Sequence, residues 1–78
     1  MELSPRQQDL YLMFVQAAGK KPGCLFEYAP AMGWNTVEHP GLPHGCVEVD
    51  TDDIDALADR GYIEYVKLGF ILTKRSPA

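Results

Sequence analysis

The chain has 78 residues, with 7 lysines and arginines against 11 aspartates and glutamates, and its formal net charge is −4. This length fits one small domain, and 46% hydrophobic with 23% charged residues is typical of a globular rather than a disordered chain. The acidic balance disfavours nucleic acid, because neutralising phosphates requires a basic face, and no apolar run approaches the roughly 20 residues of a membrane-spanning helix.

The N-terminal segment predicts a helix that begins at a capping motif. Ser4 is the expected N-cap, Pro5 takes the first helical position, and Gln7 completes a capping box. Apolar residues then recur at helical spacing, at Leu10, Met13, Phe14, Ala17 and Ala18. Further apolar residues widen this face, so we expect the helix to be covered on more than one side. Gly19 is the expected C′ residue.

Prolines and glycines punctuate residues 22–49, which makes this segment the hardest to interpret. Cys24 to Ala29 is compatible with either a short strand or a helical turn. Trp34 to Glu38 and Cys46 to Val49 predict a β-hairpin with a long, turn-rich loop. Trp34 and Tyr65 are candidate interface anchors, since aromatic side chains dominate binding hot spots, but for Trp34 the core is the favoured location.

A second helix is predicted after Asp50 or Thr51, either of which can cap it. Its apolar face comprises Ile54, Leu57 and Ala58. Gly61 is the expected C′ residue of this helix.

The C-terminal part predicts a second hairpin. Tyr62 to Val66 and Phe70 to Thr73 are the expected strands, joined by a tight connection at Lys67 to Gly69. We therefore expect residues 1–75 to form a single α+β domain, and residues 76–78 to be a terminus or the start of a linker.

The region from Asp50 to Arg75 resembles the last helix and wing of a winged-helix domain. The resemblance is carried by Ile54, Leu57, Arg60-Gly61-Tyr62-Ile63 and Gly69-Phe70-Ile71-Leu72-Thr73. The opening helix, with its Ser-Pro-x-Gln start, is similar to the first helix of that family. The segment from Trp34 to Gly45 stands where such a domain has its second helix. The resemblance thus implies a winged-helix-like frame: a first helix, an irregular segment with a β-hairpin, a short helix, and a C-terminal wing.

Acidic residues gather on the second predicted helix, at Asp50, Asp52, Asp53, Asp55 and Asp59. At about 100° per residue, Asp52, Asp55 and Asp59 fall opposite the apolar face. The resemblance makes this the recognition helix, where carboxylates would oppose phosphates. One alternative is a solvated face whose first carboxylates complement the helix dipole, and the other is a patch that contacts a partner. The spacing lacks the glycine and distal glutamate of a calcium loop.

Cys24, His39, His44 and Cys46 are the residues whose chemistry suits a zinc site. Their spacing matches no finger pattern, so we expect instead a buried or half-buried cysteine pair and two loop histidines. Cys46 beside His44 could be drawn as a thiol nucleophile and its base, but nothing else in the sequence supports this chemistry. We predict no catalytic residue, metal or cofactor.

The sequence thus predicts a non-catalytic binding module that engages a basic protein partner through Asp52, Asp55 and Asp59, as an adaptor or an N-terminal accessory domain. The alternative is a DNA-binding regulator that contacts the DNA backbone through its wing, with the contacts at Lys20, Lys21, Lys67, Lys74 and Arg75. A third hypothesis is an acidic protein that mimics DNA. The N-terminus lacks a signal-peptide pattern, and 2 cysteines are too few for a disulfide scaffold, so we expect a cytoplasmic protein with no membrane contact.

Overall fold

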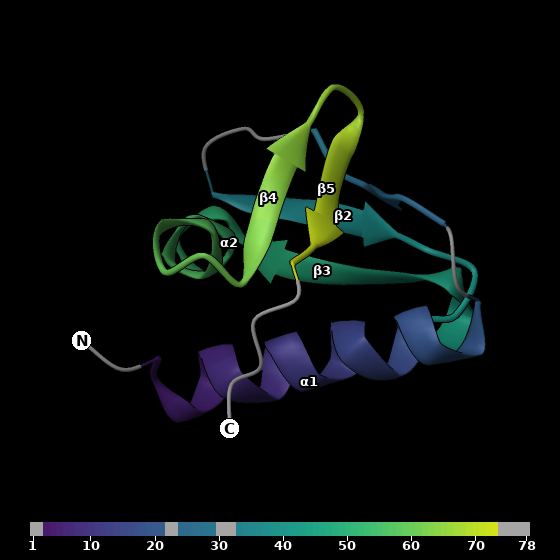
Figure 1. The fold of residues 1–78 in the computed structure, drawn as a ribbon, viewed down its shortest axis with the longest axis horizontal. Helices are drawn as coiled ribbons and strands as arrows, with labels where there is room; N and C mark the ends of the chain where they lie inside the picture. Colours follow the sequence, from purple (N-terminus) through teal and green to yellow (C-terminus); the bar gives the residue numbers. More distant parts are fainter. Residues whose placement is uncertain (1–2, 22–23, 30–32, 74–78) are drawn as a thin grey trace.

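The computed structural model describes residues 3–21, 24–29 and 33–73 (Figure 1). In chain order the elements are α1 (Pro5–Lys20), β1 (Phe26–Glu27), β2 (Trp34–Glu38), the short 3₁₀ turn η1 (Pro43–Gly45), β3 (Cys46–Asp50), α2 (Thr51–Asp59), β4 (Ile63–Val66) and β5 (Gly69–Leu72). The strands form one antiparallel sheet in the order β3-β2-β1-β5-β4. The domain is therefore α+β, as the sequence predicts.

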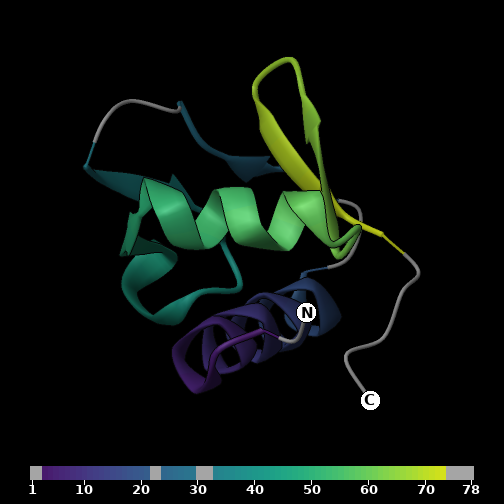
Figure 2. The same cartoon turned by 90° about the vertical axis from the view of Figure 1, so that its left-hand side faces the viewer.

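Both helices lie against one face of the sheet. Figures 1 and 2 show α1 running beneath the strands and α2 packed beside β4. Burial alternates along the paired strands of the first hairpin: Val37 and Val49 are buried, while Thr36, Glu38 and Glu48 are exposed. This period of two is that of a sheet with one covered face and one open face.

The core is built around three phenylalanines, one from α1 and two from neighbouring strands. The rings of Phe26 and Phe70 stack with their centroids 5.1 Å apart, and Phe14 meets each of them at 5.2 Å. All three side chains are at most 1% exposed. Each such burial stabilises the fold by about 1.5–3 kcal/mol, so this cluster fixes α1 beneath the sheet.

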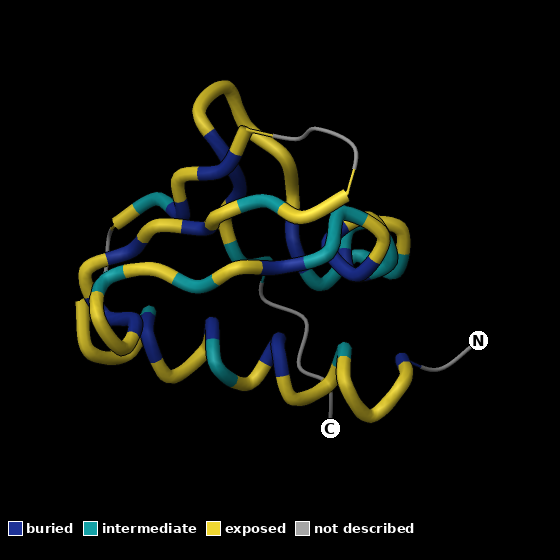
Figure 3. Tube along the Cα trace, turned by 180° about the vertical axis from the view of Figure 1, so that it is seen from behind, coloured by how far each residue is buried: buried dark blue, intermediate teal, exposed yellow. Residues whose placement is uncertain are grey.

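The start of α1 is confirmed and two predictions for the rest of it are wrong. Ser4 accepts a hydrogen bond from the backbone N–H of Gln7, whose side chain returns to the Ser4 N–H. The helix continues through Gly19 to Lys20 rather than ending at a glycine C′. It is also covered on one side only: Figure 3 shows its far side exposed, and Leu12 is 46% exposed.

The middle of the chain contributes three strands, of which two form the predicted hairpin. The hairpin β2–β3 is confirmed, and its register pairs Val37 with Val47. Residues 24–29 contain the short strand β1, which pairs with β2 on one side and β5 on the other. The predicted core position of Trp34 is wrong, because the alternation that buries Val37 turns Trp34 outward and leaves it 66% exposed.

The C-terminal half follows the prediction closely. Asp50 caps α2 by accepting a hydrogen bond from the Asp52 N–H, and Gly61 just beyond the helix has φ +80°. The strands β4 and β5 begin one residue after and one before the predicted positions, respectively. None of the helices in the described ranges is both long enough and apolar enough to cross a membrane.

The glycines of α1 and β5 provide a matched pair of stability tests. A Cβ at Gly19 would meet nothing within 4 Å, whereas a Cβ at Gly69 would lie 1.9 Å from the carbonyl oxygen of Phe26. We expect Gly19→Ala to raise the free energy of unfolding by about 0.5–1 kcal/mol, as in a helix interior, and Gly69→Ala to lower it by about 1–3 kcal/mol through overpacking. Urea denaturation measures both. Destabilisation by Gly19→Ala would mean that α1 ends before this residue.

Candidate functional site

Asp53 is the one acidic residue of α2 that points into the protein. It is 4% exposed, and its carboxylate accepts from the Arg6 guanidinium at 3.0 Å and 3.1 Å and from the Gln7 amide at 3.2 Å. These bonds join the first turn of α1 to the first turn of α2. Asp53 therefore serves the fold, and its charge is already compensated.

Asp52, Asp55 and Asp59 lie on the opposite side of α2 and are all exposed, and together they define the α2 acidic face. Within the described part of the chain, none of the three forms an ion pair. No basic residue occupies the last turn of α2, where the helix dipole is itself negative. The structure thus places the three predicted residues on one exposed surface of α2, where none forms an ion pair with another described residue.

Tyr65 of β4 fixes the middle of the α2 acidic face. Its hydroxyl donates a hydrogen bond to the Asp55 carboxylate at 2.5 Å, and its ring stacks on Tyr28 with the centroids 6.4 Å apart. Burial and this hydrogen bond both raise the pKa of Tyr65, so the hydroxyl stays protonated and remains a donor. At 41% exposure, Tyr65 also contributes apolar surface beside the carboxylates.

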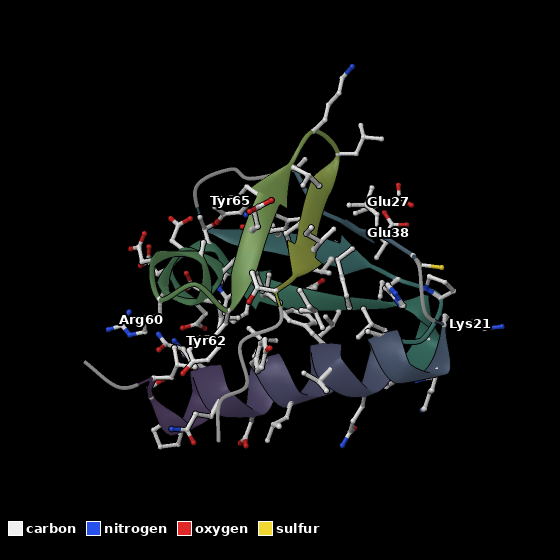
Figure 4. All side chains as sticks on the ribbon, in the orientation of Figure 1. Lys21, Glu27, Glu38, Arg60, Tyr62 and Tyr65 are labelled. Atoms are coloured by element: carbon white, nitrogen blue, oxygen red, sulfur yellow. The ribbon has the colours of Figure 1, made fainter. Side chains whose placement is uncertain are left out.

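The basic residues predicted for DNA contact are not brought together. Lys20 and Lys21 lie at the C-terminal end of α1, whereas Lys67 lies in the turn between β4 and β5, on the opposite side of the molecule (Figures 1 and 4). Lys74 and Arg75 fall outside the described residues. The three described lysines thus lie in two separate places and do not form one continuous surface for binding a DNA backbone.

The cysteines and histidines weighed as a zinc site are dispersed. Cys24 and Cys46 are both exposed, which corrects the expectation of a buried cysteine pair. Both histidines lie in the loop between β2 and β3, as predicted; His44 is exposed with φ 60°, whereas His39 is only 2% exposed. Within the described ranges, no three residues of metal-binding type come close enough to hold an ion.

His39 is held in its neutral form by its surroundings. Its Nδ1 accepts a hydrogen bond from the Gly41 N–H at 2.9 Å, and its ring stacks on Phe26 at 4.2 Å. Its Nε2 makes no hydrogen bond of ordinary geometry with another described residue. Burial lowers the pKa of His39, although the backbone carbonyl of Cys24 partly opposes this effect.

The open face of the sheet carries a second group of carboxylates. Glu27 and Glu38 are direct cross-strand partners and lie side by side in Figure 4. Glu48 and Glu64 are also exposed. Like charges directly opposite each other weaken strand pairing, so this face is electrostatically unfavourable between β1 and β2.

Sequence reasoning missed a hollow beside Trp34. It has a volume of about 290 Å³ and lies between α1 and β3, with walls of Leu10, Met13, Val47 and Val49. We call it the β3 hollow. The sequence feature that could have predicted this site is the alternation from Trp34 to Glu38. It places the Trp34 indole on the exposed face of its strand.

No model of a known protein family matches this sequence, and neither a curated protein nor a solved structure matches it. The winged-helix resemblance therefore stays a prediction. Function has to be inferred from the residues and their geometry.

The two kinds of aspartate on α2 should differ in what they contribute to stability. We expect Asp53→Asn to lower the free energy of unfolding by about 1–2 kcal/mol, because it weakens charge-assisted hydrogen bonds at a buried position. The control Asp59→Asn changes an exposed carboxylate and should stay within about 0.5 kcal/mol of the parent. Chemical denaturation of both variants tests this. Equal effects would contradict a structural role for Asp53.

Stability should fall on mild acidification because of His39. The unfolded chain takes up a proton at the ordinary histidine pKa of 6.5, whereas the folded chain does so only at lower pH. Below about pH 6.5 the unfolded state binds more protons, so the free energy of unfolding decreases as the pH falls.

Denaturation at about pH 7.5 and about pH 5.5 measures this dependence. His39→Asn keeps an acceptor for the Gly41 N–H. It should remove most of the pH dependence of the free energy of unfolding, at some cost in stability at both pH values. His44→Asn is the matched control and should retain the pH dependence of the parent protein. A parent protein equally stable at both pH values would refute the prediction.

Proposed function

We propose that this protein is a non-catalytic binding module that presents the α2 acidic face to a basic surface of a protein partner. The observation that carries the proposal is the contrast between one buried, paired aspartate of α2 and three exposed ones. Asp53 forms an ion pair with Arg6. Its neighbours Asp52, Asp55 and Asp59 are exposed, and none of them forms an ion pair with another described residue. Charges placed this way attract a basic partner and steer its approach.

The α2 acidic face is also preorganised. The Tyr65 hydrogen bond holds Asp55 against β4, so at least this carboxylate loses little freedom on binding. An exposed tyrosine beside fixed charges is a common composition for a binding hot spot. Rigid presentation of this kind lowers the entropic cost of association.

We further propose that the frame is winged-helix-like. The support is the chain order of α1, α2 and the β4–β5 hairpin, with the β2–β3 hairpin in the place of a second helix. In such a frame α2 corresponds to the helix that enters the major groove. Its carboxylates would repel phosphates there, which favours a protein over DNA as the partner.

Two triple variants with the same change of net charge test the function. Asp52, Asp55 and Asp59 are changed together to Asn, which preserves an acceptor for Tyr65. In the control, Glu27, Glu38 and Glu64 on the open sheet face are changed together to Gln. The probe is a soluble helical peptide of alanine and lysine, titrated against each protein at low and high salt by calorimetry and amide NMR.

We expect the α2 variant to bind the peptide at least about tenfold more weakly than the parent. The sheet variant should stay close to the parent, and parental affinity should fall with salt. Equal losses in both variants would mean that only net charge matters and would overturn the proposal. A duplex DNA that binds at low salt and is released by Lys67→Glu would favour the DNA-binding alternative instead.

A further inference from the structure

β3 is an edge strand whose outer hydrogen-bonding groups can be identified from the register. At one end of the β2–β3 pair the backbone N–H of His39 donates to the carbonyl oxygen of Gly45. At the other end the backbone N–H of Thr51 donates to the carbonyl oxygen of Gly33. In an antiparallel ladder, hydrogen-bonded pairs alternate with non-bonded pairs. Position 47 and position 49 of β3 therefore bond to β2, whereas Cys46 and Glu48 direct their N–H and C=O groups away from it.

Among the described strands none pairs with this outer side, because β3 is the last strand of the sheet. An exposed edge of this kind is a template for another strand. The N–H and C=O of Glu48 sit at its centre.

The β3 hollow lies directly along the same edge. Four consecutive residues of β3, at positions 47–50, line it together with residues of α1. Neighbouring residues of a strand point to opposite faces, so a hollow that touches all four must run beside the strand. A segment added to β3 would thus place every second side chain between β3 and α1, against Leu10, Met13 and Val49.

The rim of the β3 hollow is acidic. Its charged residues are Arg6, Asp9, Glu48, Asp50 and Asp53. The guanidinium is already bound to Asp53, so three carboxylates remain without a cation among the lining residues. Trp34 stands beside them at 66% exposure and offers its ring face to a cation.

We propose that the edge of β3 binds an extended segment of a protein partner by strand addition, with an aliphatic side chain in the β3 hollow and lysine or arginine on both sides of it. The residue directly opposite Glu48 would share its face of the sheet and would be basic. This second surface is distinct from the α2 acidic face, and its backbone hydrogen bonds make strand addition the fitting mode of recognition.

A second copy of the chain is disfavoured as the occupant of this edge. Antiparallel pairing of two β3 strands centred on Glu48 would place the two Glu48 carboxylates opposite each other. The remaining rim carboxylates would then meet like charges from the other copy. A basic segment relieves this repulsion instead of doubling it.

The probe is the capped peptide Ser-Lys-Val-Lys-Val-Lys-Ser, with three comparison peptides. The first replaces the lysines by glutamate, the second replaces the valines by serine, and the third carries N-methyl groups on alternate backbone nitrogens. The chain has 1 tryptophan, so the fluorescence of Trp34 reports binding directly. Amide exchange at Glu48 reports strand pairing, because none of the described strands pairs with this N–H.

We expect the lysine–valine peptide to change the Trp34 emission and to slow exchange of the Glu48 amide at least about tenfold at saturation. The three comparison peptides should bind at least about tenfold more weakly. Equal binding of the N-methylated peptide, or unchanged exchange at Glu48, would overturn strand addition.

Two substitutions at neighbouring positions of α1 complete the test. Met13→Lys places a cation in the β3 hollow and should weaken binding at least about tenfold, whereas Leu12→Lys changes an exposed residue outside the hollow and should not. Circular dichroism confirms that both variants fold. If Met13→Lys binds the peptide as the parent does, the hollow is not the site.

The α2 triple variant separates this proposal from the proposed function. It should retain most of its affinity for the lysine–valine peptide, because the β3 hollow is intact. Loss of binding in that variant, with Met13→Lys unaffected, would place the peptide on the α2 acidic face. A free protein that is dimeric by light scattering, with Glu48 already protected from exchange, would make a second copy the occupant.

Discussion

The stacking of Phe26 on its neighbours holds the two hairpins of this protein in one sheet. Its ring lies between His39 at 4.2 Å and Phe70 at 5.1 Å, and it contacts Phe14 of α1 at 5.2 Å. The strand that carries Phe26 has only 2 residues, so its ladder alone is short. Aromatic pairs contribute about 0.5–1.5 kcal/mol beyond the burial of their area. Phe26 thus helps to position α1, and with it the β3 hollow, together with Phe70 and the bonds from Arg6 to Asp53.

Features encoded over a few residues are the ones the sequence predicts well. The capping box at Ser4, the cap at Asp50 and the glycine after α2 each depend on neighbours within a turn, and all are confirmed. The two hairpins follow from short apolar runs separated by turn residues. The joining of those hairpins by Phe26, and the burial of His39 against it, depend on contacts between distant segments that no local pattern reveals.

The same distinction applies to the candidate surfaces. Helical spacing separates the α2 acidic face from the apolar face, and this arrangement holds in the structure. It does not reveal that Asp53 would pair with Arg6, 47 positions away in the sequence. Trp34 lies outside the core because strand alternation, and not the hydrophobicity of its side chain, decides its orientation. Edge position is a property of the whole sheet, so the open side of β3 emerges only from the strand order.

The facing carboxylates of Glu27 and Glu38 weaken the pairing between the two hairpins. They sit at the seam between the hairpins, where β1 pairs with β2 through a single residue pair. By contrast, β2 pairs with β3 through five residue pairs, and β4 pairs with β5 through four. The weakest strand pairing of the sheet is therefore the one between β1 and β2. We therefore expect the sheet to open between β1 and β2 before its outer strands fray.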